Sequence, residues 1–212
     1  MSHIVLIGGG GHCASVIEAI RSTGSHEIVG VLDLGVRVGS EVLGVPVIGP
    51  DADLVRMGAR RVDGFVVTLG STGDASGRRR LHAAAVAAGL APVSVVHASA
   101  VVSPSAMLGD GVFVGALAYV GSRTSVGPCA IINSHASVDH DCSIGEFAHV
   151  APGAVLSGGV MVGAGSHIGT GACVSHGLAI GEATVIGVGS VVVSDIGDGV
   201  SAYGNPCREV VK

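Results

Sequence analysis

The chain has 212 residues, a formal net charge of −5 and a single lysine, Lys212, so a nucleic-acid-binding surface is not expected. No uninterrupted apolar run reaches the ~18 residues that a membrane span needs, and Met1 to Ile7 lacks the features of a secretory signal. We therefore expect a cytoplasmic protein that contacts neither membrane nor nucleic acid. Its scattered cysteines should be reduced thiols; they are Cys13, Cys129, Cys142, Cys173 and Cys207.

Residues 1–92 are predicted to form a small Rossmann-like domain with a parallel sheet, because strand patterns alternate with helix patterns. Strands are expected at about 3–8, 27–32, 45–48, 64–69 and 93–96, and helices at about 13–22, 50–58 and 75–88. Asp51 is a candidate cap of the second helix.

A run of glycines follows the first predicted strand: Gly8, Gly9, Gly10 and Gly11, then His12. Such a loop lets the backbone approach a ligand, and the helix after it offers free N–H groups to an anion, which favours a phosphate-bearing ligand. The dinucleotide fingerprint is incomplete, because Cys13 stands where its third glycine belongs, and a tight turn without a ligand stays open. Asp33 ends the second strand, where an acid often meets a ribose hydroxyl.

From residue 96 to residue 192 every sixth residue is aliphatic, without an insertion. The next residue is often glycine, and the fourth residue after each aliphatic one is usually small. A six-residue period predicts a β-helix, with the aliphatic and small residues inside a triangular prism and glycine at the bend, where it adopts positive φ easily. Three hexads make a coil, so residues 18 apart should stack. We assign the solenoid to residues 93–197 and a cap or tail to 198–212. This pattern resembles the hexapeptide-repeat acyltransferases, and the resemblance implies a left-handed parallel β-helix.

One histidine falls on an outward position of the solenoid. His140 is the third residue of its hexad and lies between Asp139 and Asp141. A carboxylate beside an exposed imidazole fixes its tautomer and raises its basicity, which suits a general base. His149 follows half a coil later, and Gly158 should stack on His140. Taken singly, each histidine is more typical of a solvated surface than of a catalytic site.

The glycine loop ahead of a hexapeptide solenoid and the segment from Asn133 to His149 are similar to the bacterial sugar acetyltransferases related to sialic acid O-acetyltransferase. That family includes N-acetyltransferases of nucleotide-linked 4-amino-4,6-dideoxy sugars. The resemblance implies that His140 is the base, that Asp141 orients it, and that His149 and the Gly158 N–H lie by the thioester carbonyl of acetyl-CoA. It further implies that the nucleotide sugar is held by Gly9, Gly10, Gly11, His12, Asp33 and Asn133, although family members often have two acids where this chain has Asp33-Leu34.

The same resemblance implies a homotrimer with active sites between subunits, acetyl-CoA as co-substrate and no metal. The co-substrate would lie along a groove past Gly163, Gly169 and Gly181, with Arg208 near a phosphate. A cap role for the segment around Arg208 is an equal alternative.

Three other functions are open from sequence. The nearest is O-acetylation of a sialic-type sugar. A zinc enzyme of the γ-carbonic anhydrase type is suggested by the five-residue spacing of His135 and His140, and a purely structural or binding solenoid is the third. Cys142 stands near His140 but on an interior position, which argues against a thiol nucleophile.

Overall fold

The computed structural model describes residues 2–57 and 62–210 of the chain. They belong to two compact units, one made of Met1–Gly70 with Ser76–Ala98 and the other of Ser71–Ala75 with Ser99–Lys212. Among the described residues, no helix has the length and apolar character to cross a membrane. The two units are described in turn.

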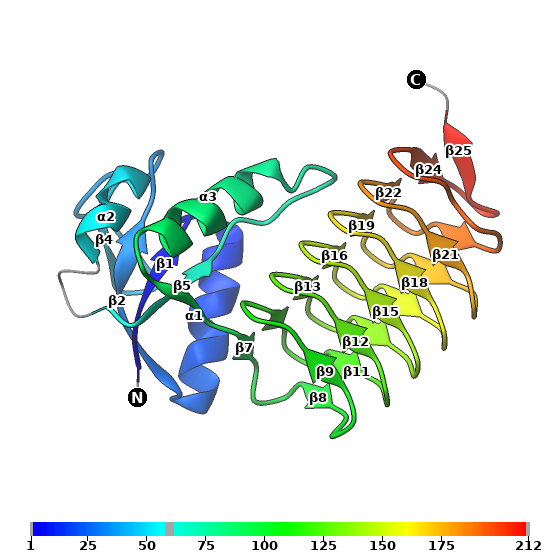
Figure 1. The fold of residues 1–212 in the computed structure, drawn as a ribbon, viewed down its shortest axis with the longest axis horizontal. Helices are drawn as coiled ribbons and strands as arrows, with labels where there is room; N and C mark the ends of the chain where they lie inside the picture. The colour runs from blue at the N-terminus through cyan, green and yellow to red at the C-terminus, as the bar shows by residue number, and fades with distance from the viewer. Residues whose placement is uncertain (1, 58–61, 211–212) are drawn as a thin grey trace. The chain divides into compact units, whose positions relative to one another are not determined.

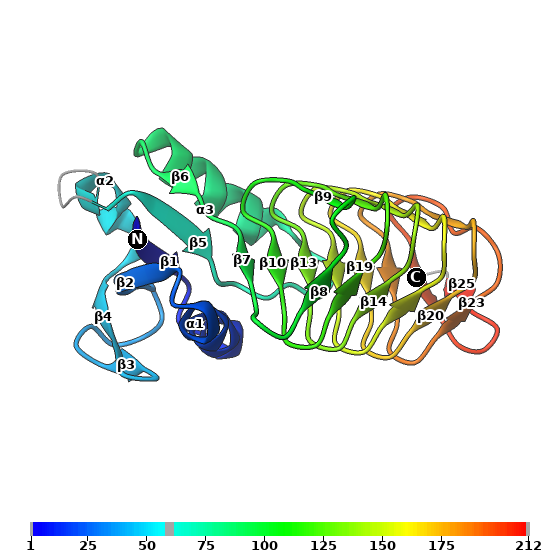
Figure 2. The same ribbon diagram turned by 90° about the horizontal axis from the view of Figure 1, so that it is seen from below.

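The first unit is a sheet with helices on both faces (Figures 1 and 2). Its elements are β1 (Ser2–Ile7), α1 (Gly11–Thr23), β2 (His26–Leu32), β3 (Glu41–Val42), β4 (Val45–Gly49), η1 (Asp51–Asp53), α2 (Leu54–Met57), β5 (Gly64–Val67), α3 (Ser76–Ala87), β6 (Ala91–Pro92) and β7 (Val95–Val96). The sheet order is β3-β4-β2-β1-β5-β6, with β1 parallel to β2 and β5. The expected parallel sheet is therefore confirmed, with the two-residue β3 added antiparallel at its edge.

Strand β1 is the centre of the first unit because it is buried on both sides. Val5 and Ile7 join the apolar cluster that contains Phe65 and Leu81, on the side of α2 and α3. Successive strand residues point to opposite faces, so Ile4 and Leu6 face the other way, towards α1. This two-sided burial is typical of a parallel sheet and explains why the first strand reads as an unbroken apolar run.

Two local predictions in this unit were wrong. Asp51 does not cap a helix: Pro50 is the N-cap of the 3-10 turn, and no side chain caps it. The strand expected at 93–96 was too long, since only Val95–Val96 forms a strand there (β7), and β6 is a separate strand before it. The predicted end of the second helix, Gly58, lies outside the described residues.

The second unit is a parallel β-helix whose coils stack one after another, as Figures 1 and 2 show. Its two-residue strands are β8 (Val101–Val102), β9 (Met107–Leu108), β10 (Phe113–Val114), β11 (Tyr119–Val120), β12 (Ser125–Val126), β13 (Ile131–Ile132), β14 (Ser137–Val138), β15 (Ser143–Ile144), β16 (His149–Val150), β17 (Val155–Leu156), β18 (Met161–Val162), β19 (His167–Ile168), β20 (Cys173–Val174), β21 (Ala179–Ile180), β22 (Val185–Ile186) and β23 (Val191–Val192). Two longer strands follow, β24 (Ser201–Tyr203) and β25 (Arg208–Val210).

These strands form the three faces of a prism. The first face contains β10, β13, β16, β19, β22, β24 and β25, the second contains β8, β11, β14, β17, β20 and β23, and the third contains β9, β12, β15, β18 and β21. Within a face, paired residues are 18 apart, as Ser137 is from Val155. The spacing drops after residue 192, where Val185 pairs with Ser201, so the hexad rule ends where the sequence predicted.

The interior of the prism also follows the prediction. From Val114 to Val192 the aliphatic residue of each hexad is buried, whereas Val102 and Leu108 in the first coil are only partly buried. Most of the small residues near the corners are buried too. Two hydroxyls at this small position donate to backbone carbonyls, from Thr124 to Asp139 at 2.6 Å and from Ser166 to Gly181 at 2.6 Å. The polar atoms in the narrow core therefore have partners, which offsets the cost of burying them.

The role predicted for the repeated glycine was wrong. Positive φ occurs three residues after each aliphatic residue, at Leu117, Arg123 and Asp141 among others, and not at the glycine that follows the aliphatic residue. That glycine is needed for a different reason, the close approach of the next coil. A Cβ added at Gly145 would lie 2.5 Å from the backbone nitrogen of Ala164.

This difference can be tested by comparing two glycines. Gly145→Ala should lower the unfolding free energy by about 3 kcal/mol, near the upper end for overpacking, since the obstacle is backbone of the next coil. Gly153→Ala has positive φ but nothing within 4 Å of its new Cβ, so it should cost only about 1 kcal/mol. Thermal unfolding of both variants measures the ranking, and an equal or reversed order would contradict the close-approach explanation.

Candidate active site

His140 lies in the turn between β14 and β15, at the corner where the second face of the prism meets the third. Its side chain is 57% exposed, as its outward hexad position predicted. The ring Nδ1 is 2.7 Å from Oδ2 of Asp141, and its backbone N–H donates to Oδ1 of Asp139 at 2.7 Å. The backbone bond and the carboxylate together hold the imidazole in a defined orientation.

Asp141 is in turn held by Arg123, the residue one coil earlier in the stack. The guanidinium donates from Nε to Oδ1 at 2.6 Å and from Nη2 to Oδ2 at 2.7 Å. Hydrogen bonds from Arg123 and His140 lower the pKa of Asp141 to about 2. An ionised carboxylate only accepts hydrogen bonds, so Nδ1 of His140 is the protonated nitrogen and Nε2 carries the free lone pair.

Gly158 lies directly under the His140 ring, one coil later. A Cβ at Gly158 would lie 2.5 Å from Cε1 and 2.6 Å from Nε2 of the imidazole. The ring therefore occupies the space that any other residue would fill. In the part of the chain that the structure describes, the Gly158 N–H donates no hydrogen bond to protein.

Cys142 is the nearest thiol, and its surroundings suppress it as a nucleophile. Burial raises the pKa of the Cys142 thiol. Its sulfur contacts two backbone carbonyls, Ser157 O at 3.3 Å and His140 O at 3.7 Å, so the S–H is a donor and the side chain points inward. A thiol kept protonated and buried is a poor nucleophile.

Asn133 and His149 form a second group, on the first face of the prism. The Asn133 Nδ2 lies 3.1 Å from His149 Nε2, and His149 Nδ1 lies 2.8 Å from the carbonyl oxygen of Ser71. Since a carbonyl only accepts, Nδ1 donates and Nε2 accepts from the amide of Asn133. His149 is consequently a neutral, almost fully buried residue with both ring nitrogens engaged.

Residues 71–75 bury this second group, which the sequence did not reveal. Gly73 lies against Val185, and Ala75 packs with Cys129 and Phe147. His167 also belongs here: its ring meets that of His149 edge to face, with centroids 4.9 Å apart, and burial lowers the pKa of His167. A signal for His167 was present, since it is 18 residues after His149 and so stacks on it.

The structure thus groups the predicted residues in two places within one chain. His140, Asp141 and Gly158 are together at one corner. Asn133 lies in the turn directly after β13 and His149 lies in β16, and both strands belong to the first face. His135 occupies the corner after β13, a different corner from His140. Within the described residues, no cluster of three His, Cys, Asp or Glu side chains has metal-binding geometry.

Three of the residues expected along the co-substrate groove are glycines at corners of the prism. A Cβ at Gly163, Gly169 or Gly181 would strike backbone of the next coil at 2.5 to 2.6 Å, so these glycines serve coil packing. Arg208 begins β25, which pairs antiparallel with β24, and its guanidinium donates to the carbonyl of Cys207 at 2.8 Å.

In the first unit, Asp33 closes the glycine loop. Its carboxylate accepts from the N–H of Gly9 at 2.5 Å and from the N–H of Gly35 and Val36 at 2.6 and 2.7 Å. Burial opposes ionisation of this carboxyl, but the three backbone bonds outweigh it and hold the pKa of Asp33 below its usual value. Asp33 therefore shapes the loop whether or not it also meets a ribose.

The rest of the loop is open. A Cβ at Gly10 or Gly11 would have no atom within 4 Å, and the first turn of α1 carries no capping side chain. Burial, together with the positive charge of Arg78, lowers the pKa of His12 to about 4, so His12 is neutral near pH 7. Uncapped N–H groups at a helix N-terminus form a setting for a phosphate.

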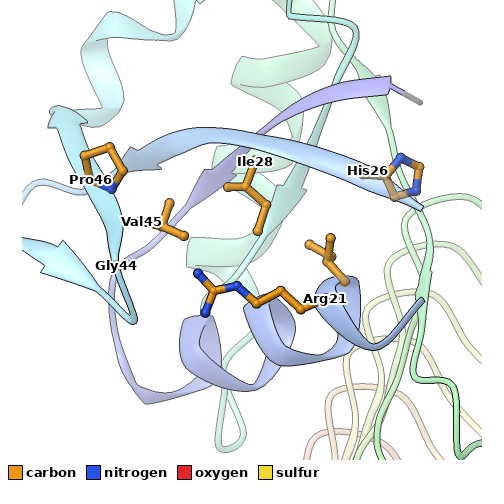
Figure 3. Close-up of a pocket in the computed structure, with 7 residues that line it drawn as sticks. Arg21, His26, Ile28, Gly44, Val45 and Pro46 are labelled. Atoms are coloured by element: carbon orange, nitrogen blue, oxygen red, sulfur yellow. The ribbon is translucent and has the colours of Figure 1, made fainter. Parts of the chain in front are cut away.

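A separate cavity of about 300 Å³ lies at the other end of α1 (Figure 3). Its wall includes Arg21, His26 and Ile28, with Val45 and Pro46 opposite. Arg21 donates from Nη2 to the carbonyl of Leu43 at 2.7 Å, which ties the β3–β4 hairpin to the helix. No residue predicted for the site lines this cavity, and we assign it no ligand.

The chain resembles known proteins in sequence and in structure. The family described as PglD N-terminal domain matches residues 3–84. The chain is 39% identical to PerB from Caulobacter crescentus, solved in complex with CoA and GDP-perosamine, covering 100% of this chain and 98% of that one with a TM-score of 0.93. It is 37% identical to the acetyltransferase domain of PglB from Neisseria gonorrhoeae in complex with acetyl coenzyme A, covering 98% of each chain with a TM-score of 0.91.

A third structure, WeeI from Acinetobacter baumannii, is 23% identical over 99% of this chain and 100% of that one, with a TM-score of 0.87, and supports the fold alone. These similarities confirm the expected fold class, a Rossmann-like β/α domain followed by a left-handed parallel β-helix.

The depressed pKa of His12 predicts a pH dependence of stability in the first unit. In the unfolded chain His12 binds a proton once the pH falls below its ordinary pKa of about 6.5, whereas in the folded chain it does so only below about pH 4. The unfolding free energy therefore falls as the pH falls between these two values. Between pH 7 and pH 5 the loss should be about 2 kcal/mol. His12→Gln should remove it, whereas His3→Gln, at an exposed position, should not.

Urea unfolding followed by far-UV circular dichroism measures this effect, because the described helices all belong to the first unit. A variant at residue 12 that keeps the wild-type pH dependence would show that His12 is not its source.

Proposed function

This chain belongs to the hexapeptide-repeat nucleotide-amino-sugar acetyltransferase family, and we propose that it transfers acetyl from acetyl-CoA to the 4-amino group of a nucleotide-linked 4-amino-4,6-dideoxy sugar. The observation that carries the proposal is the exposed His140–Asp141 pair above Gly158, in a chain 39% identical to perosamine N-acetyltransferase. We expect the reaction to take place in the cytoplasm, with no metal.

The proposed chemistry is direct transfer. The sugar amine attacks the thioester carbon while Nε2 of His140 takes the amine proton; the C–S bond then breaks and CoA leaves as the thiol, receiving a proton in turn. The Asp141 carboxylate accepts a hydrogen bond from Nδ1–H of His140 and stabilises the imidazolium that forms. Such base catalysis typically contributes ~10²–10⁴ in rate. The buried Cys142 supports this route over a covalent intermediate.

The backbone of Gly158 is our candidate for stabilising the oxyanion. Its N–H is beside the His140 ring and is not used by the described protein groups. A developing negative charge on the thioester oxygen would be near both the base and a fixed donor.

For the nucleotide sugar we propose the first unit. The open Gly10 and Gly11 and the uncapped start of α1 suit a diphosphate, with neutral His12 beside them and Asp33 holding the loop in shape. These contacts recognise phosphate, which every nucleotide sugar carries.

We propose a homotrimer with active sites between subunits. His140 is at the corner opposite the first face, which carries His149 and Asn133, so a site that uses both groups requires two chains. Acetyl-CoA would lie in the resulting groove, along the corner glycines Gly163, Gly169 and Gly181, towards Arg208.

The role of His140 is tested by His140→Ala. Turnover should fall by ~10²–10⁴ because the proton acceptor is lost, while binding of acetyl-CoA should persist because the fold is unchanged. His135→Asn is the matched control: it changes an exposed histidine at a left-handed corner of the same solenoid and should keep wild-type turnover. Thiol release measures turnover, and full activity of the alanine variant would remove His140 as the base.

Gly158→Ala tests the space under the imidazole. The new methyl group would overlap the ring of His140, so the ring must swing away and the 2.7 Å bond to Asp141 must break. Since Gly158 does not have positive φ, the substitution adds no left-handed strain. We expect kcat to fall by about 10²–10⁴, the typical contribution of the base that is displaced, with little change in melting temperature. Wild-type kcat would contradict this packing role.

The choice between N- and O-acetylation is settled by a substrate panel. Acetyl transfer to a 4-amino nucleotide sugar, but not to free sialic acid, is the expected outcome.

A further inference from the structure

Arg123 is a charged residue close to the proposed base, in contact with Asp141, and it has no role in the proposed reaction. It stands 18 residues before Asp141, at the same corner of the preceding coil, and both residues have the left-handed backbone conformation, with φ of 59°. This shared conformation places the two side chains in line along the stack. The backbone N–H of Arg123 also donates a hydrogen bond to Ser105 Oγ at 3.2 Å, one coil further back.

We propose that Arg123 is a positioning residue, which fixes the Asp141 carboxylate by a two-point hydrogen bond and thereby sets the orientation and proton affinity of His140. This inference rests on the proposed function. The Nη2 of Arg123 and the Nδ1 of His140 bond to the same oxygen, Oδ2, at 2.7 Å each. Any movement of the guanidinium therefore moves the acceptor of the imidazole.

The geometry excludes a simple surface ion pair as a full description. An exposed pair usually contributes little to stability, and the Arg123 side chain is 68% exposed. A forked, two-point contact instead specifies direction, because the rigid guanidinium matches both carboxylate oxygens at once. What Arg123 supplies is thus orientation and charge balance at Asp141.

The charge of Arg123 has a predictable sign of effect on the base. The guanidinium of Arg123 balances the negative charge of the Asp141 carboxylate, and that balance is lost when Arg123 is removed. The other titratable groups next to His140 are Asp139, whose carboxylate accepts the backbone N–H of His140, and the buried thiol of Cys142, which contacts the backbone carbonyl of His140. Neither contacts the guanidinium, so removing Arg123 leaves the carboxylates to act alone.

The test compares Arg123→Gln and Arg123→Lys with wild type. In Arg123→Gln the acidic limb of the kcat/KM profile should move to higher pH by roughly 0.5 unit, since the imidazolium gains from an unshielded carboxylate. The kcat should fall about tenfold because the carboxylate is no longer fixed, with the KM for acetyl-CoA unchanged. Arg123→Lys keeps the positive charge but loses the two-point hydrogen bond to Asp141. The acidic limb of its kcat/KM profile should therefore stay at the wild-type pH while kcat falls.

Two further variants complete the design. Asp141→Asn should move the limb in the opposite direction, to lower pH, because the negative charge is lost. Ser105→Ala removes only the acceptor of the backbone N–H of Arg123, and it should match wild type both in kcat and in the pH of the acidic limb. A purely structural role for Arg123 would lower the melting temperature without moving the limb, and that result would overturn the proposal.

A readout without turnover separates this inference from the proposed function. The ring carbon signal of His140, assigned by its loss in His140→Asn, is titrated by nuclear magnetic resonance in wild type and Arg123→Gln. A higher titration midpoint in the variant supports the coupling even if no sugar is acetylated, which would refute only the function. An unchanged midpoint overturns the coupling, whatever the activity.

Discussion

The 18-residue register of the β-helix is the constraint on which the proposed chemistry depends. Because Ser137 pairs with Val155, the turn that holds His140 lies directly next to the turn that holds Gly158, and the same step places Arg123 before Asp141. Residues from three successive coils meet through one repeated hydrogen-bond pattern. A change of one residue in the length of a coil would separate all of them, so the aliphatic hexads that keep the register also keep the candidate site.

Two kinds of position at the corners make this register possible. The glycine after a strand allows the next coil to approach, and the residue two places further on adopts the left-handed conformation. The left-handed position accepts side chains, among them Arg123, His135 and Asp141, although such residues normally avoid positive φ. We infer that the tightly stacked coil over-determines the backbone there, so that functional side chains can be displayed at a strained position.

The sequence predicted the solenoid, its interior residues and the outward direction of His140, because all three follow from a period that is visible in the chain. It also predicted that Cys142 is interior, and the burial of its thiol agrees. It did not predict that residues 71–75 cover His149, since that contact joins segments 78 residues apart and no periodicity connects them. Arg123 was accessible in principle, as the residue 18 before Asp141, but only a stacking analysis that includes charges would have selected it. The roles of the individual site residues stay predictions.

The contrast between the two histidines gives a physical reason to propose an intersubunit site. His149 is already buried and has both ring nitrogens engaged, whereas His140 is more than half exposed to water in a single chain. Water around a base competes for its lone pair and weakens the fixed charges that orient it. We infer that the corner of His140 needs enclosure by another wall before direct acetyl transfer is efficient. A neighbouring β-helix with its own apolar and glycine-rich face would supply that wall without any change in the fold of either chain.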